Sequence, residues 1–154
     1  MEEFSLDVLE VINTVNQIFI TADSRNWDAC LNLFIEEPEI NYSSFTGNPA
    51  AKMKSSELIN TWKNFLPGFD HTMHFITNQK VTIHGDTAAC FSYLTALHVI
   101  KNADGGESWT LYGTYDHELE RNSHEWKVSK MRLNFIHQEG NQKLPEIAAG
   151  RMKT

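Results

Sequence analysis

A long stretch of alternating polar and apolar residues, interrupted only by short turns, runs from His71 to Gln138. Alternation with a period of two is typical of β-strands, and turns rich in Gly, Asn and Asp favour hairpins between neighbouring strands. The predicted strands are His71–His84, Thr87–Lys101, Glu107–Arg121 and Glu125–Gln138. Long strands joined by hairpins form an antiparallel sheet, and the rest of the chain must cover the apolar face of that sheet.

The residues before this stretch supply the cover. Apolar side chains recur at helical spacing, Asn26 is a suitable N-cap, and Pro67-Gly68 is a helix stop. Helices are predicted over residues 6–22, 27–35 and 57–66, and a strand over 39–45. This order predicts an α+β fold in which three N-terminal helices close a curved antiparallel sheet into a cone around an interior pocket. The length of 154 residues fits one domain, 1–154, with 140–154 as a less regular tail.

The last strand of the stretch changes phase along its length. Trp126 and Val128 occupy one parity, whereas Met131, Leu133 and Phe135 occupy the other. One extra residue near position 129 or 130 would bring both groups to the same face. The sequence therefore predicts a β-bulge at Ser129-Lys130 that curves the sheet.

Composition limits the class of partner and the compartment. The chain has 13 basic and 20 acidic residues, a net charge of −7, which argues against a nucleic acid or an anionic membrane as partner. Cys30 and Cys90 fall in a helical and a strand pattern and are interpreted as buried free thiols in a reducing compartment. The first residues lack a basic segment followed by a long apolar run, so a cytoplasmic location is expected.

Two histidines lie inside runs that otherwise indicate buried strands. His98 shares its predicted face with small and apolar residues, namely Ala88, Cys90, Ser92, Leu94, Ala96 and Ile100. His74 occupies a similar position in the preceding strand. An imidazole on an apolar face needs a partner or a function, and small neighbours leave room for a cavity. Two titratable rings directed at one interior therefore suggest acid–base chemistry in a pocket.

Together with this order of elements, particular segments carry a resemblance to a known family. They are 22–28 (ADSRNWD), 40–45 (INYSSF), 72–76 (TMHFI) and Leu97-His98. The chain resembles the NTF2-like superfamily and, within it, the SnoaL-like branch, with scytalone dehydratases as the most similar members. The resemblance implies a cofactor-free site in a hydrophobic cavity and a homo-oligomer, a dimer or trimer, formed through the sheet. By position it implies catalytic roles for Asp23, His74, His98 and Tyr42.

The sequence departs from the scytalone dehydratase pattern around the expected substrate. Ala22 stands where a second tyrosine would help to polarise the substrate, and Gly113 and Tyr115 replace polar cavity residues. The resemblance therefore supports the acid–base groups more than the same substrate or reaction. Residues expected to contact substrate are Phe45, Trp62, Phe69, Tyr115, Met131, Leu133, Asn134 and Phe135, although several of them could equally belong to the core.

Each proposed catalytic residue also has a plain structural interpretation. Asp23 could cap the following helix, although Asn26 is better placed for that role. His74 and His98 could be core histidines bonded to backbone groups, and Tyr42 could be an ordinary buried aromatic residue. With Asp23 as its partner, His74 would act as a general base or acid, His98 as a second proton site or substrate anchor, and Tyr42 as a donor to a carbonyl oxygen.

Metal and nucleotide sites lack support in the sequence. His71 and His74 are three residues apart in a strand and face opposite ways, so they cannot chelate one ion, and no zinc site is expected. No G-x-G-x-x-G, Walker A or G-x-S-x-G motif occurs. The sequence favours a cofactor-free lyase or isomerase, dehydratase-like, acting on a small apolar cyclic or aromatic carbonyl compound such as a polyketide. A cyclase or epoxide-opening enzyme, or a non-catalytic ligand-binding or dimerisation module, remains an alternative.

Overall fold

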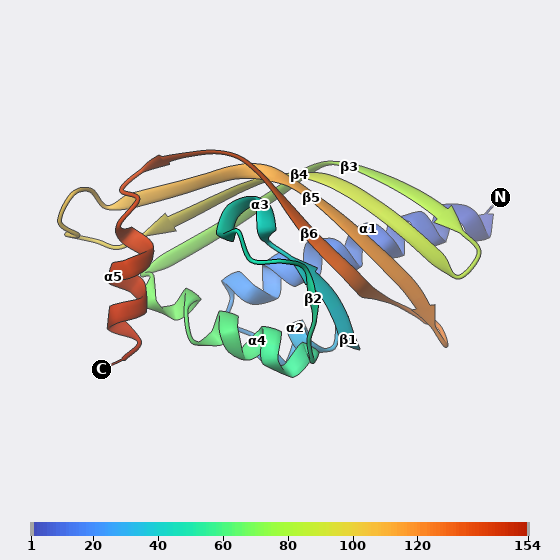
Figure 1. Ribbon diagram of the computed structural model, residues 1–154. Helices are drawn as coiled ribbons and strands as arrows, with labels where there is room; N and C mark the ends of the chain where they lie inside the picture. Colours follow the sequence, from blue (N-terminus) through green and yellow to red (C-terminus); the bar gives the residue numbers. More distant parts are fainter. Residues whose placement is uncertain (1, 154) are drawn as a thin grey trace.

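A single curved sheet with six strands, in the order β2-β1-β6-β5-β4-β3, organises the fold (Figure 1). The computed structural model describes residues 2–153, with side chains from residue 6 onward. The strands are β1 (Phe34–Asn41), β2 (Ala51–Lys52), β3 (His71–His84), β4 (Thr87–Val99), β5 (Ser108–Asn122) and β6 (Glu125–Gly140). The helices are α1 (Glu2–Asp23), α2 (Trp27–Leu31), α3 (Ser43–Thr46), α4 (Ser55–Lys63), the 3-10 turn η1 (Leu66–Gly68) and α5 (Leu144–Arg151). The predicted α+β fold with a curved sheet is confirmed.

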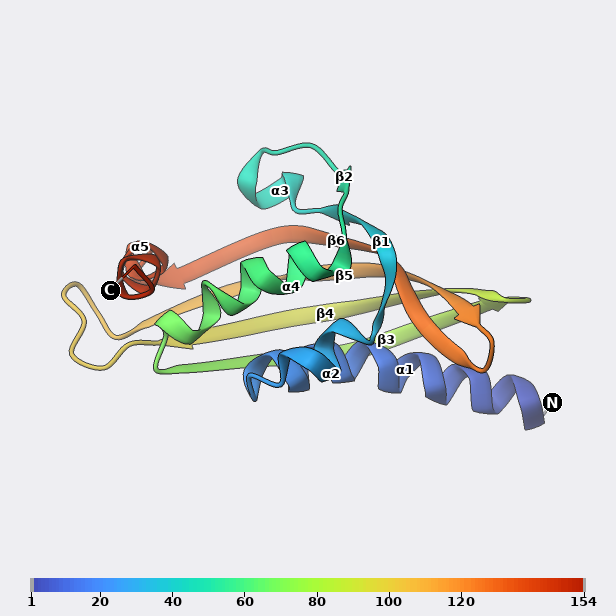
Figure 2. The same cartoon turned by 90° about the horizontal axis from the view of Figure 1, so that it is seen from below.

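The helices α1, α2 and α4 all lie on the same face of the sheet (Figure 2). Helix α1 packs along β3, and its inward side chains Val11, Val15 and Ile18 are fully buried. Burying each of these side chains contributes about 1.5–3 kcal/mol, which fixes the helix on the sheet. Because α1 ends at Asp23, this packing carries the carboxylate to the inner face of β3.

Bulges in β6 bend the sheet around the covered face. The pairing of β5 with β6 shifts register between Glu118 and Leu119, opposite Ser129, so the predicted bulge is confirmed. A second shift falls between Tyr112 and Gly113. At Gly113 an added Cβ would lie 2.4 Å from the carbonyl oxygen of Asn134, so only glycine fits this close approach of the two strands.

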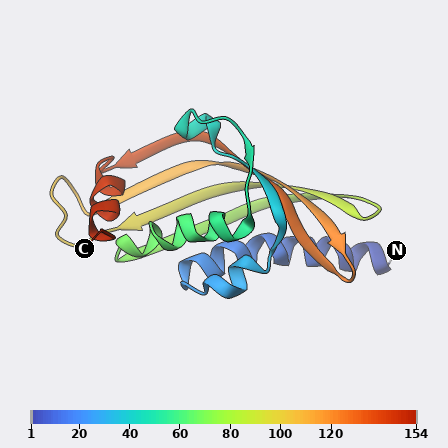
Figure 3. The same cartoon turned by 60° about the horizontal axis from the view of Figure 1, so that its bottom comes forward.

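The segment between α2 and α4 differs from the prediction. Strand β1 begins at Phe34, inside the predicted second helix, and pairs in parallel with β6, so the sheet is not wholly antiparallel. The N–H of Val128 donates to the carbonyl of Leu33 at 2.8 Å. Hydrogen bonding to β6 therefore makes this segment a strand although its local sequence favours a helix. Residues 43–45, predicted as the end of a strand, belong instead to the short helix α3, which lies beside β6 (Figure 3).

The expectation of a less regular tail was wrong for most of residues 140–154. Residues 144–151 form helix α5, in which Leu144 and Ala148 are fully buried. The side chain of Arg151 donates to the carbonyl of Gly68 and to the carboxylate of Asp70, both at 2.9 Å. The helix is thus held by one buried apolar side chain per turn and by the two hydrogen bonds of Arg151. Its apolar residues are too few to show a helical period in the sequence.

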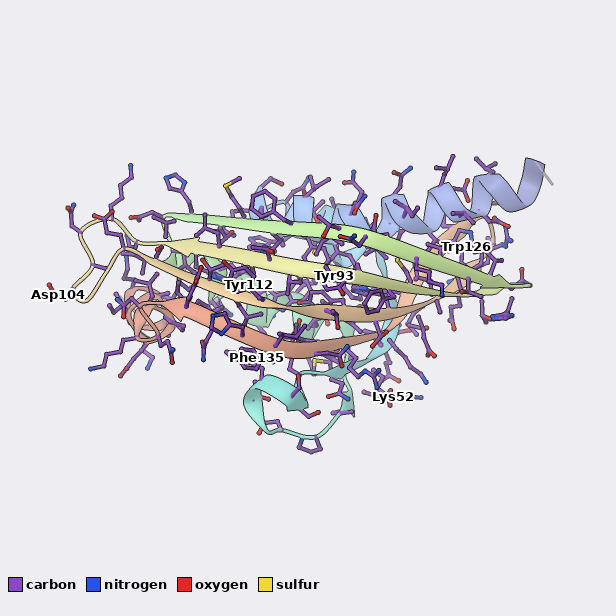
Figure 4. The ribbon with its side chains drawn as sticks, turned by 90° about the horizontal axis from the view of Figure 1, so that it is seen from above. Lys52, Tyr93, Asp104, Tyr112, Trp126 and Phe135 are labelled. Carbon is purple, nitrogen blue, oxygen red and sulfur yellow. The ribbon has the colours of Figure 1, made fainter. Side chains whose placement is uncertain are left out.

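The face of the sheet turned away from the helices is partly apolar (Figure 4). Its exposed large apolar side chains include Met73, Phe75, Tyr93 and Ile136. A homo-oligomer formed through this face stays a prediction.

Candidate active site

A cavity of about 290 Å³ lies between the helices and the concave face of the sheet. Its wall consists of Phe19, Ala22, Tyr42, Phe45, Thr46, Thr61, Trp62, Phe65, Leu66, His74, Leu94, Ala96, His98, Trp109, Leu111, Tyr115 and Leu133. None of these side chains is a carboxylate, a lysine or an arginine. The cavity therefore suits a neutral and largely apolar ligand.

A larger hollow, of about 520 Å³, crosses the strands and is lined by charged side chains. Lys130 pairs with Glu118 at 3.1 Å and Arg132 with Asp116 at 2.8 Å, and all of these side chains are substantially exposed. Charges that already neutralise one another in solvent provide little to hold a ligand. The smaller apolar cavity is therefore the better candidate site.

Asp23 and His74 form a tightly bonded pair at the edge of this cavity. Carboxylate Oδ1 lies 2.7 Å from His74 Nδ1, and Oδ2 accepts from the backbone N–H of His74 at 2.8 Å. Oδ1 also accepts from the hydroxyl of Thr72 at 2.9 Å. Partial burial on its own would raise the pKa of Asp23, but hydrogen bonds from His74 and Thr72 outweigh it, and the pKa lies below the ordinary value of 3.8. Asp23 is therefore ionised at neutral pH.

The ionised carboxylate fixes the tautomer of His74. A carboxylate can only accept hydrogen bonds, so the ring must carry its hydrogen on Nδ1 to bond Asp23. In the neutral ring, Nε2 then has a free lone pair. His74 lines the cavity while Asp23 lies behind it, which is the arrangement that a carboxylate-oriented general base requires.

His98 faces the same cavity but differs in its electrostatics. Its Nδ1 lies 3.2 Å from the carbonyl oxygen of Trp109, and its ring stacks on the Trp109 indole at a centroid distance of 4.3 Å. The rings of His98 and His74 are 5.9 Å apart. Burial, reinforced by the charge that His74 can carry, lowers the pKa of His98 to about 4. His98 is thus neutral at pH 7, donates from Nδ1 to the carbonyl, and keeps Nε2 as an acceptor.

Tyr42 and Tyr115 place two phenols in the cavity wall. Burial raises the pKa of Tyr42 to about 12, against the opposing influence of hydrogen bonding to Tyr115. Burial also raises the pKa of Tyr115. The Tyr42 hydroxyl is 4.0 Å from the sulfur of Met131, a weak contact. Both phenols are neutral at pH 7. Because hydrogen bonding lowers the pKa of Tyr42 and raises that of Tyr115, Tyr115 is the donor to Tyr42, and the Tyr42 hydrogen can be donated to a ligand oxygen.

The structure thus brings Asp23, His74, His98 and Tyr42 together, as the sequence predicted. Only some of the residues that were predicted to contact substrate line the cavity. Phe45, Trp62, Tyr115 and Leu133 line the cavity.

The other predicted wall residues lie outside the lining. The Phe69 ring lies 4.8 Å from the His98 ring, and the Met131 sulfur lies 4.0 Å from the Tyr42 hydroxyl. Phe135 packs against Phe45 at 5.4 Å. Asn134 donates to Thr114 and Asp116, on the opposite parity from the inward residues of β5.

The sequence reasoning missed two residues near the Asp23–His74 pair, Thr72 and Arg25. Thr72 precedes His74 by two positions and so shares its face of β3, a signal that the alternation contained. Arg25 has a backbone φ of 61°, a left-handed conformation that nothing in its local sequence indicates. Its guanidinium donates to the Thr72 hydroxyl at 2.9 Å.

Among the side chains that the structure describes, from residue 6 to residue 153, no group of three or more His, Cys, Asp or Glu is arranged to hold a metal ion. No helix in the same range combines the length and apolar character needed to cross a bilayer. The side chains that line the cavity include two imidazoles and two phenols, which are acid–base groups and hydrogen-bond donors.

Comparison with solved structures places this architecture among known proteins. A protein from Kribbella flavida, Kfla4162, is 27% identical over 92% of this chain and 98% of its own, with a TM-score of 0.86. A candidate scytalone dehydratase from Novosphingobium aromaticivorans is 18% identical over 92% and 93% of the two chains, with a TM-score of 0.79. A hexachlorocyclohexane dehydrochlorinase from Novosphingobium barchaimii is 16% identical over 89% and 91%, with a TM-score of 0.72.

The last two similarities show a shared fold alone, because their identities are low. No curated protein matches the sequence. Residues 3–132 match the SnoaL-like domain family, and this match spans most of the chain. The chain therefore belongs to the SnoaL-like domain family of the NTF2-like superfamily.

Proposed function

We propose that this protein is a cofactor-free acid–base enzyme, a lyase or isomerase, that acts on a neutral cyclic or aromatic carbonyl compound of the polyketide type. The observation that carries the proposal is the 2.7 Å bond between Asp23 and His74, with the His74 ring on the wall of an apolar cavity. A partly buried carboxylate that orients an imidazole toward an apolar cavity is a common device for moving protons.

The reaction starts with proton abstraction next to the carbonyl. His74 Nε2 takes the proton, and the C–H electron pair moves toward the carbonyl to give an enolate whose oxygen accepts a hydrogen bond from Tyr42. Asp23 stabilises the imidazolium that forms. The enolate then collapses and expels a β-hydroxyl group, which leaves as water with the proton from His74. In an isomerisation the same proton returns to a different carbon.

His98 has a different role from His74. Because its Nδ1 hydrogen is directed at the Trp109 carbonyl and its pKa is about 4, it cannot donate a proton from Nε2 at pH 7. Its Nε2 lone pair can accept a hydrogen bond from a substrate hydroxyl and orient that group. A ligand that fills this largely aromatic cavity displaces water, which strengthens each of these electrostatic contacts.

Elimination is the step that the comparisons support within this class. Two structural neighbours are named for removing water and hydrogen chloride from their substrates. Both reactions pair abstraction of a proton from carbon with departure of a group from the adjacent carbon, which one oriented base can begin.

Substrate charge provides the test of this function. The test compounds are a neutral bicyclic ketone with a β-hydroxyl group and its carboxylate-bearing analogue. The neutral ketone should bind and lose water. The carboxylate should bind at least about tenfold more weakly, because the cavity wall has no lysine or arginine to replace its hydration. Isothermal titration calorimetry measures binding, and absorbance of the conjugated product measures turnover. Tighter binding of the carboxylate, or binding of neutral ketones without turnover across a panel, would contradict the proposal.

A further inference from the structure

A second pair of side chains lies behind the catalytic pair. Thr72 donates its hydroxyl hydrogen to Asp23 Oδ1 at 2.9 Å, and Arg25 Nη1 lies 2.9 Å from the same hydroxyl oxygen. Thr72 is buried, whereas Arg25 and Asp23 are partly exposed. Arg25, Thr72, Asp23 and His74 thus form one continuous hydrogen-bonded chain that ends at the cavity wall.

The direction of each bond in this chain is fixed by chemistry. A guanidinium has only donors, so the Thr72 oxygen must accept from Arg25. A hydroxyl has one hydrogen, and the carboxylate can only accept, so that hydrogen must point to Asp23. With its own oxygen occupied by Arg25, Thr72 is held as a donor. Asp23 Oδ1 then receives Thr72 and His74 together, and the carboxylate cannot rotate away without losing both bonds.

Arg25 connects this chain to the cavity wall. Its guanidinium also donates to the carbonyls of Ala22 at 3.0 Å and Leu66 at 2.9 Å, and both of these residues line the cavity. The backbone of Arg25 adopts a φ of 61°, which costs a non-glycine residue free energy and therefore needs compensating contacts. One side chain thus links the end of α1, strand β3 and the turn η1.

We infer that Arg25 and Thr72 are positioning residues that hold the Asp23 carboxylate in the one orientation that keeps the hydrogen of His74 on Nδ1 and its Nε2 lone pair in the cavity. This inference rests on the proposed function of the Asp23–His74 pair. Neither residue touches the substrate; both act through Asp23.

Nitrogen-15 NMR of the histidine rings tests the inference without a substrate, because imidazole nitrogen shifts distinguish the two neutral tautomers. The wild-type protein should show His74 with its hydrogen on Nδ1. Thr72→Val keeps the shape of the side chain but removes the hydroxyl, and it should shift the population toward the other tautomer and raise the pKa of Asp23. Thr72→Ser restores the hydroxyl and should restore the wild-type signal. Thr77→Val is the matched control, since Thr77 is exposed on the opposite face of β3.

Arg25 is tested by a graded pair of variants. Arg25→Met should loosen Thr72 and shift the His74 tautomer as Thr72→Val does, while Arg25→Lys keeps a cationic donor and should give a smaller shift. Circular dichroism establishes that each variant is folded. Tautomer populations in Thr72→Val and Arg25→Met that equal those of the wild-type protein would overturn the inference.

Turnover separates this inference from the proposed function. Thr72→Val should lower kcat by about 10- to 100-fold with little change in KM, as loss of outer hydrogen-bond partners commonly does. If His74→Ala abolishes turnover but Thr72→Val leaves both kcat and the tautomer unchanged, only the positioning role is wrong. If His74→Ala leaves turnover intact, the proposed function itself is wrong, and the NMR result still decides what Thr72 and Arg25 do to Asp23.

Discussion

Replacing His74 with alanine should lower kcat by about 10²- to 10⁴-fold, since a positioned general base commonly contributes a factor of that order. The fold should survive, because Asp23 keeps its bonds to the backbone N–H of residue 74 and to Thr72, and the removed ring lies at the cavity rather than in the core. Substrate affinity should change little, because the apolar wall remains. Steady-state kinetics with the neutral hydroxy-ketone measures both parameters.

Asp23→Asn should also lower kcat, because it changes the tautomer of His74. The amide can donate to His74, which would place the ring hydrogen on Nε2 and remove the base from the cavity, so a loss of about 10³- to 10⁴-fold is expected. His84→Ala provides the matched control, because His84 is exposed at the end of β3. If His74→Ala or Asp23→Asn turns over substrate as fast as His84→Ala does, the pair has no catalytic role.

Stability should fall steeply in mild acid. His117 is fully buried, and no hydrogen-bond partner for either ring nitrogen lies among the described residues. Burial lowers the pKa of His117 from 6.5 to about 4, although the nearby charge of Asp116 opposes the shift. The pKa of His98 is lowered to about 4 as well. Both rings therefore bind protons in the unfolded chain at a higher pH than in the folded protein.

The sign and window of this effect follow from linkage. As pH falls from about 6.5 to about 4, the unfolded state gains protons that the folded state does not, so the free energy of unfolding decreases. Each histidine contributes at most about 1.4 kcal/mol per pH unit. Four carboxyls in the folded protein have a pKa below the ordinary value of 3.8, namely Asp7, Asp23, Asp70 and Asp116. Their protonation lowers the free energy of unfolding mainly at the acid end of this pH window.

One substitution measures how much His117 contributes to this pH dependence of stability. His117→Leu removes the buried titratable group, so the slope of the unfolding free energy between pH 6 and 4.5 should fall by roughly half, since two similar histidines contribute. Stability at pH 7 should not decrease by more than the repacking cost of about 1–3 kcal/mol, because unpartnered polar atoms are removed. Urea unfolding at several pH values measures the slope, with His84→Leu as the exposed control. An unchanged slope in His117→Leu would show that His117 finds a partner or solvent in the folded protein.

Much of the sheet could be predicted from the sequence because its strands are long and alternate over most of their length. The bulge at Ser129 was visible as a change of phase in β6. Strand β1 was partly mistaken for helix because its parallel partner β6 lies far away in the sequence, and no local pattern reports such a pairing. Helix α5 was missed for a similar reason, since its order depends on contacts with η1.

The candidate site was predictable where a residue type conflicted with its surroundings. A histidine on an apolar strand face is such a conflict, and His74 and His98 both line the cavity. Membership in the pocket wall was harder to predict, because Phe69 and Phe135 have the same character as the residues that do line it. The role of Arg25 depends on a left-handed backbone and on two partners far away in the sequence, Thr72 and Leu66, which the sequence does not display.

The most direct test of the account follows one proton. A neutral cyclic ketone that binds in the cavity but has no leaving group is incubated with the protein in D₂O, and proton NMR follows the hydrogen on the carbon next to the carbonyl. We expect this hydrogen to exchange for deuterium much faster with the wild-type protein than in buffer alone. The acceleration should be lost in His74→Ala and Asp23→Asn. Exchange of the bound ketone at the buffer rate, or equally fast exchange in His74→Ala, would contradict the claim that the Asp23–His74 pair moves a proton on carbon.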